Sequence, residues 1–165
     1  EFNNPYILSL KGALEGVPMQ YETEAHPFNN SGEATGVLVG GNLCLLAHVT
    51  GSRSEVNTKD RILFIEDVGE YLYNIDRMML QLKRAGKLKK LAGLIIGGFT
   101  DCKDTERPFG KTAYEIIQEQ VKGYDFPICY NFPVSHEREN YALKIGATVK
   151  LSVSDKEVLL KEQVQ

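Results

Sequence analysis

Uninterrupted apolar runs along the chain predict buried β-strands. Three of them cover residues 36–40, 62–65 and 91–99. Continuous runs without polar alternation are typical of strands that are covered on both faces. A fourth apolar run, at 127–134, has a proline at each end and predicts a further strand.

Helices are predicted between these strands. Asn42 is a good N-cap for a helix over 43–49, and Thr112 can cap a later helix. Another helix ends at Gly86. Apolar residues at helical spacing support the two longer helices; they are Leu72, Ile75, Met79 and Leu82 in one, and Ala113, Ile116, Ile117 and Val121 in the other.

The two ends of the chain have weaker patterns. Residues 6–15 predict a short helix, and the polar stretch 19–36 predicts a loop or an edge hairpin. Apolar and polar residues alternate over 142–161 around a turn at 154–156, which predicts a hairpin. The order of strand, helix, strand, helix, strand and hairpin indicates an α/β domain with some antiparallel pairing. We expect a single domain over 1–165, with 1–35 as a linker or edge segment and 36–162 as the core.

Composition and charge narrow the function classes. The chain has 165 residues, 42% hydrophobic and 25% charged, with a net charge of −3. A negative net charge argues against a nucleic-acid-binding surface. No apolar run in the sequence is long enough to span a bilayer. The three cysteines include no CxxC pair, which favours reduced thiols in a cytoplasmic protein.

Two residues at strand ends are candidates for chemistry. Glu66 follows the most hydrophobic strand, and His136 follows the run at 127–134. If the two strand ends point the same way, a Glu66 carboxylate could fix the tautomer of His136 and leave its other nitrogen as a base. Two simpler interpretations stay open: His136 as a solvated loop residue, and Asp67 and Glu70 as acidic residues at the start of the next helix.

Other chemistry is weakly supported. No serine lies in a Gly-x-Ser-x-Gly elbow, and Ser135 points to the opposite face from His136 on an extended chain. The three histidines are scattered without metal-ligand spacing, so no metal or organic cofactor is expected. The pairs at 40–41 and 97–98 are Gly-Gly sequences, which we expect to allow either tight turns or close backbone approach at strand ends.

Several motifs in order resemble the LD-carboxypeptidase family of serine peptidases, which also contains the microcin C immunity peptidases. They are Gly-Gly-Asn-Leu at 40–43, Ile-Leu-Phe-Ile-Glu-Asp-Val-Gly-Glu at 62–70, Tyr-Asn-Ile-Asp-Arg at 73–77, Leu-Gln-Leu-Lys-Arg-Ala-Gly at 80–86, Leu-Ile-Ile-Gly-Gly-Phe at 94–99, Phe-Pro-Val-Ser-His at 132–136 and Leu-Lys-Ile-Gly at 143–146. The resemblance covers roughly residues 36–152.

The resemblance implies a site divided between two domains. In the family, an N-terminal domain carries the nucleophilic serine, and a swivelling β/β/α domain with a mixed sheet and flanking helices supplies the Glu and His of a Ser-Glu-His triad. By motif position, Glu66 and His136 match these two residues, and Gly41 and Asn42 match a segment near the site, with a substrate-binding role. The chain, which begins without Met, is therefore expected to be the C-terminal domain alone and to be inactive without the serine.

The resemblance also implies an activity and partners. The intact protein would remove a terminal D-alanine from peptidoglycan tetrapeptides in the cytoplasm. Its partners would be a muropeptide substrate, its own N-terminal domain and a second copy in a homodimer, with no nucleic acid or membrane. Two alternatives remain: a microcin-immunity-like hydrolase of aminoacyl or peptidyl nucleotide conjugates, and a non-catalytic binding or assembly module.

Overall fold

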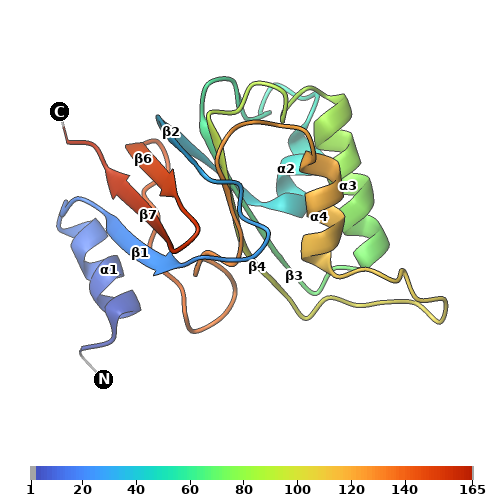
Figure 1. Ribbon diagram of the computed structural model, residues 1–165, viewed down its shortest axis with the longest axis horizontal. Helices are drawn as coiled ribbons and strands as arrows, with labels where there is room; N and C mark the ends of the chain where they lie inside the picture. Colours follow the sequence, from blue (N-terminus) through green and yellow to red (C-terminus); the bar gives the residue numbers. More distant parts are fainter. Residues whose placement is uncertain (1–2, 165) are drawn as a thin grey trace.

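One mixed seven-stranded sheet, in the order β1-β7-β6-β2-β3-β4-β5, forms the framework of the computed structural model, which describes residues 3–164 (Figure 1). The strands are β1 (Gln20–Glu24), β2 (Gly32–Asn42), β3 (Ile62–Val68), β4 (Gly93–Thr100), β5 (Ile128–Cys129), β6 (Thr148–Val153) and β7 (Glu157–Glu162). The helices are α1 (Pro5–Leu14), α2 (Leu43–Val49), α3 (Leu72–Arg84) and α4 (Ala113–Val121).

Strand β2 joins the two halves of the sheet. Its first part, residues 32–37, pairs antiparallel with β6, and its last part, residues 38–42, pairs parallel with β3. The parallel half continues through β4 and β5, while β6, β7 and β1 form an antiparallel half. The mixed sheet with flanking helices confirms the α/β class expected from the sequence.

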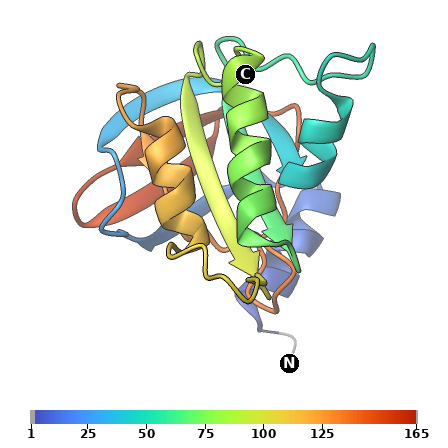
Figure 2. The same cartoon turned by 90° about the vertical axis from the view of Figure 1, so that its right-hand side faces the viewer.

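Helices α2, α3 and α4 cover one face of the parallel half, with α3 beside α4 (Figure 2). The N-cap predicted at Thr112 forms and is part of a capping box, because the Thr112 hydroxyl accepts from the Glu115 amide and the Glu115 carboxylate accepts from the Thr112 amide. The apolar residues at helical spacing in α3 and α4 face the sheet, and most of them are buried; the exception is Leu72, which is only partly buried.

The opposite face of the parallel strands is also covered, by the antiparallel half and by the chain after β5. Ile62, Phe64 and Ile95 pack there against apolar residues of β6 and β7. The continuous apolar runs of β3 and β4 are explained by this double covering, as the sequence predicted. None of the helices within residues 3–164 has the length and hydropathy of a membrane span.

The prediction of a strand over 127–134 is mostly wrong, because only Ile128–Cys129 pairs as a regular β-strand. Asn131 adopts a positive φ of 56°, and Pro133 has no amide hydrogen for a sheet ladder. The chain nevertheless continues along β4, where the Phe132 amide donates to the Ile96 carbonyl at 3.1 Å.

The polar stretch 19–36 contains regular structure. Gln20–Glu24 forms the edge strand β1, which pairs with β7, and β2 already begins at Gly32. The prediction of a loop or edge hairpin therefore missed the long start of β2, whose alternating pattern of exposure follows its position in the antiparallel half.

Candidate active site

The carboxyl ends of the parallel strands bring the predicted site residues to one edge of the sheet. Asn42 at the end of β2 is directly opposite Glu66 on β3 in the parallel register. Ligands of open α/β sheets gather outside the carboxyl ends of strands. The pairing register therefore places the two motif segments where a ligand would be expected.

Glu66 lies on the sheet face away from α2 and α3. Side chains alternate along β3, so Ile65 and Asp67 face the helices while Glu66 faces the segment after β5. Only 9% of the Glu66 side chain is exposed. A carboxylate so deeply buried needs a polar partner.

His136 is that partner. Its Nδ1 is 2.7 Å from Oε2 of Glu66, although the two residues are 70 positions apart in the sequence. A carboxylate accepts, so Nδ1 is the donor and the imidazole is held with Nε2 available as a base. Half of the His136 side chain is exposed, at 52%, and within residues 3–164 no group bonds to Nε2. The arrangement can take a proton from a nucleophile that approaches from solvent or from another domain.

Two glycines of β4 allow the histidine segment to lie this close. A Cβ atom on Gly97 would overlap the Val134 carbonyl oxygen and approach Cβ of Glu66 to 3.3 Å. A Cβ atom on Gly98 would overlap Cβ of Ser135. The Gly98 amide also donates to the Val134 carbonyl at 3.0 Å, which ties the segment to β4. The expectation that this Gly-Gly pair permits close backbone approach is confirmed.

Asp67 has a different role from the one predicted for it. We expected it to serve the start of the helix that follows it, but its side chain faces α2. Its Oδ1 accepts from Nδ2 of Asn42 at 2.8 Å, and its Oδ2 accepts from the Cys44 amide at 3.0 Å. Strand alternation is the physical reason, since residues next to each other on β3 face opposite sides. Glu70 does lie before α3, where it accepts from Asn74 at 3.0 Å.

Asn42 is fixed in place by this network. Its Oδ1 caps α2 by accepting from the Leu45 amide at 3.2 Å, as the sequence predicted. Beside it, Gly41 has open space where a Cβ atom would lie, with nothing within 4 Å. The substrate-binding role of Gly41 and Asn42 stays a prediction, because the contacts of Asn42 described here are structural ones.

The other polar residues weighed from the sequence lie elsewhere. His26 packs among Phe28, Tyr114 and Tyr130, and His48 bonds within its own helix to the Cys44 carbonyl at 2.8 Å. Among residues 3–164, no group of three or more His, Cys, Asp or Glu side chains is arranged to hold a metal ion. Sequence reasoning missed the hydrogen bonds by which Asp67 holds Asn42 and the start of α2. The Glu-Asp pair could have indicated them, because two consecutive residues of a strand face opposite sides of the sheet.

Comparison with known proteins decides the family. Residues 35–151 match the family model described as the LD-carboxypeptidase C-terminal domain. The chain belongs to the LD-carboxypeptidase family. It is 32% identical to the probable murein peptide carboxypeptidase of Bacillus subtilis strain 168, over 94% of this chain and 50% of that protein.

Solved structures agree with this assignment. The muramoyltetrapeptide carboxypeptidase of Oxalobacter formigenes superposes with a TM-score of 0.85 at 25% identity, over 98% of this chain and 56% of the other. The microcin C7 self-immunity protein of Escherichia coli is 30% identical over 82% of this chain and 39% of its own length. Its complex with aspartyl sulfamoyl adenosine superposes with a TM-score of 0.70, over 82% of this chain and 40% of the other. The chain thus spans about half the length of the relatives it matches.

Proposed function

We propose that this chain supplies the acid–base half of a serine LD-carboxypeptidase. The intact protein would remove the terminal D-alanine from murein tetrapeptides in the cytoplasm. The observation that carries the proposal is the 2.7 Å contact between Glu66 and Nδ1 of His136, whose side chain is 52% exposed.

The proposed chemistry needs a serine from the N-terminal domain. Nε2 of His136 takes the hydroxyl proton as the serine attacks the scissile carbonyl, and later gives that proton to the leaving amine. Glu66 keeps the imidazole in the correct tautomer and stabilises its charged form. Because the nucleophile is expected outside this chain, the 165-residue chain by itself should release no D-alanine.

The murein substrate is favoured over a nucleotide conjugate. The relative with a murein peptide name matches 94% of this chain, whereas the microcin immunity protein matches 82%. The murein-type structure also superposes more closely, with a TM-score of 0.85 against 0.70. The second substrate class remains the natural competitor in any assay.

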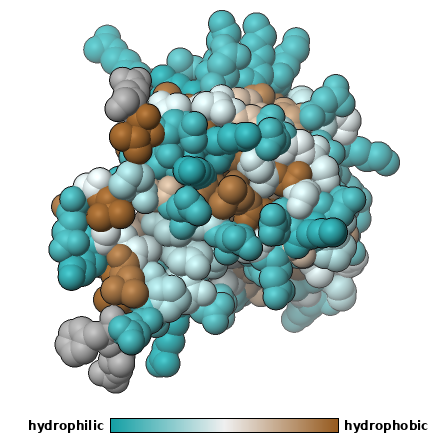
Figure 3. All heavy atoms as spheres, turned by 60° about the vertical axis from the view of Figure 1, so that its left-hand side comes forward, coloured by the Kyte–Doolittle hydropathy of each residue, from teal (hydrophilic) through white to brown (hydrophobic). Residues whose placement is uncertain are grey.

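An exposed apolar helix supports the docking of a partner. Helix α1 has no buried residue and leaves Ile7, Leu8, Leu10 and Leu14 about half exposed or more. Apolar side chains gather along this side of the molecule (Figure 3). Exposed apolar patches mark interaction sites. We expect a second copy of the protein to cover it, and sedimentation of full-length protein before and after Leu10→Lys with Leu14→Lys tests this; an unchanged molecular mass would contradict it.

The activity is tested with full-length protein and two substrates. D-alanine release from a murein tetrapeptide should exceed hydrolysis of an aminoacyl sulfamoyl adenosine in kcat/KM. His136→Ala should abolish it, whereas the matched control His48→Ala, in which the replaced histidine bonds only within α2, should keep it. Normal turnover by His136→Ala, or preference for the nucleotide conjugate, would contradict the proposal.

A further inference from the structure

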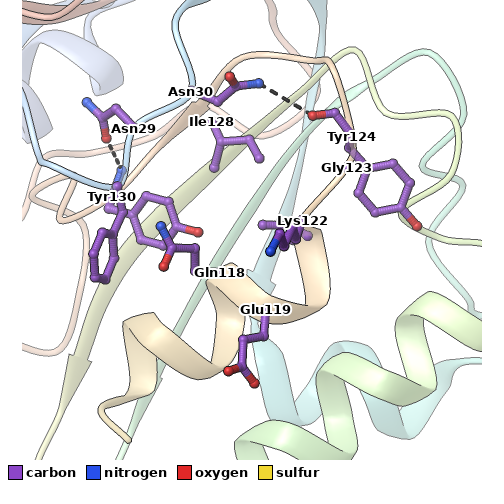
Figure 4. Close-up of a pocket in the computed structure, with 11 residues that line it drawn as sticks. Asn29, Asn30, Gln118, Glu119, Lys122, Gly123, Tyr124, Ile128 and Tyr130 are labelled. Atoms are coloured by element: carbon purple, nitrogen blue, oxygen red, sulfur yellow. Dashed lines mark hydrogen bonds between the residues drawn. The ribbon is translucent and has the colours of Figure 1, made fainter.

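A cavity apart from the Glu66–His136 site lies between the end of α4, the chain around β5 and residues 28–30. Its volume is about 520 Å³, within the range of small-molecule sites. Its apolar lining comes from Phe28, Val121 and Ile128. Its polar lining includes Gln118, Lys122 and Tyr130 (Figure 4). None of these residues belongs to the Glu66–His136 site.

Tyr130 carries an unsatisfied polar group into this cavity. The residue is only 2% exposed, and its hydroxyl has no hydrogen-bond partner among the described residues. Figure 4 shows the hydroxyl directed between Gln118, Lys122 and Ile128. A buried hydroxyl without a partner costs about 1–3 kcal/mol, so its retention points to something that accepts from it. Burial raises the pKa of Tyr130, which keeps the hydroxyl protonated as a donor.

One lysine and one glutamate line the cavity, Lys122 and Glu119. Among the ion pairs of residues 3–164 none involves Lys122. The neighbouring carboxylate, Glu119, is already paired with Lys111 at 2.7 Å. The cavity is thus lined by the Tyr130 hydroxyl, by Gln118 and by Lys122, and its acidic residue already has an ion-pair partner.

We propose that this cavity binds a small monocarboxylate with an apolar body. The carboxylate would accept from Lys122, Gln118 and Tyr130, since hydrogen bonds from a cation to a carboxylate are among the strongest in proteins. The apolar body would lie against Phe28, Val121 and Ile128. This site is independent of the proposed peptidase chemistry and needs no second domain.

The proposal is tested by titrating the ¹⁵N-labelled chain with phenylacetate and, as a neutral match, phenylacetamide. Phenylacetate should give saturable chemical-shift changes at residues 118–124 and 128–130, and phenylacetamide should bind at least roughly fivefold more weakly, because it lacks the charge. Absence of saturable changes at these residues at about 10 mM phenylacetate, or equal affinity for acid and amide, would overturn the proposal.

Two variants and one control complete the test. Lys122→Gln and Tyr130→Phe should each weaken phenylacetate binding at least roughly fivefold. Tyr130→Phe removes only the unsatisfied hydroxyl, so its fold should be retained and is checked from its own amide spectrum. Lys89→Gln, at an exposed lysine outside the cavity, should bind like the unmodified chain. Unchanged affinity in Lys122→Gln would overturn the site.

Discussion

Gly97 and Val134 are in such close contact that the Val134 carbonyl oxygen occupies the space where any other residue at position 97 would place its Cβ atom. This contact sets how near the histidine segment lies to β4, and thus the Glu66–His136 distance. A side chain of any size at position 97 must push the segment outward.

Gly97→Ala should therefore lower the free energy of unfolding by about 1–3 kcal/mol, as overpacking does. It should also lengthen the contact between Glu66 and His136. Urea unfolding measures the first effect, and the imidazole ¹⁵N shifts of His136 report the second. Gly12→Ala is the control, because its Cβ atom would meet Val17 only at an ordinary 3.5 Å; equal stability of the two variants would contradict the prediction.

Asp67→Ala should destabilise the fold by about 3 kcal/mol, because it removes a buried carboxylate that accepts three hydrogen bonds, from the Asn42 side chain and from the Cys44 and Val68 amides. The Asn42 amide and the Cys44 amide would lose their partner together. Thermal or urea unfolding measures the loss, and Asp125→Ala, at an exposed aspartate, is the matched control. A loss below about 1 kcal/mol would show that these hydrogen bonds contribute little.

The ion pair between Glu162 and Lys144 predicts a pH dependence of stability. Hydrogen bonds from Lys144, at 2.7 Å, and from the Met19 amide, at 2.8 Å, lower the pKa of Glu162 below its ordinary value. A lowered folded-state pKa stabilises the fold above the unfolded pKa of about 4.3, and that contribution is lost as the pH falls through the folded pKa.

Glu162→Gln should thus lower the free energy of unfolding by about 1 kcal/mol at pH 7, and by less near pH 3. Urea unfolding of both proteins at each pH measures the difference. A difference that stays constant between the two pH values would exclude this electrostatic origin.

The three cysteines should differ in reactivity. Burial raises the pKa of Cys129 to about 12, so its thiolate is scarce at neutral pH. Burial also raises the pKa of Cys44 and Cys102, which are partly exposed. An aromatic disulfide reagent should label Cys44 and Cys102 slowly in the native chain and reach Cys129 only after unfolding; rapid labelling of native Cys129, identified by peptide mapping, would contradict this.

The local pattern of apolar and polar residues predicted most elements of the fold, because burial decides which positions of a helix or strand are apolar. Helical spacing located α3 and α4, and the continuous apolar runs located β3 and β4, since a strand covered on both faces has no polar side to show. The segment after β5 could not be predicted in the same way. Its path depends on Gly97 and Gly98, two residues of another strand that leave room for it.

The site was predictable in part. The position of Glu66 at a strand end and of His136 after an apolar run singled out two residues that the tertiary structure brings together, at 2.7 Å. The role of Asp67 was misjudged because strand alternation sends it to α2, a helix that precedes it in the sequence. Such a contact depends on the register of β2 and β3, which no local pattern contains.

The central claim is that Glu66 and His136 act as one unit, and a double-mutant cycle on full-length protein tests it most directly. kcat/KM for a murein tetrapeptide is measured for Glu66→Gln, His136→Ala and the double variant. We predict a fall of roughly 10⁴-fold for His136→Ala, a smaller or equal fall for Glu66→Gln, and no further loss in the double variant, because Glu66 acts only through the imidazole. Wild-type-like kcat/KM in either single variant, or losses that multiply in the double variant, would contradict the account.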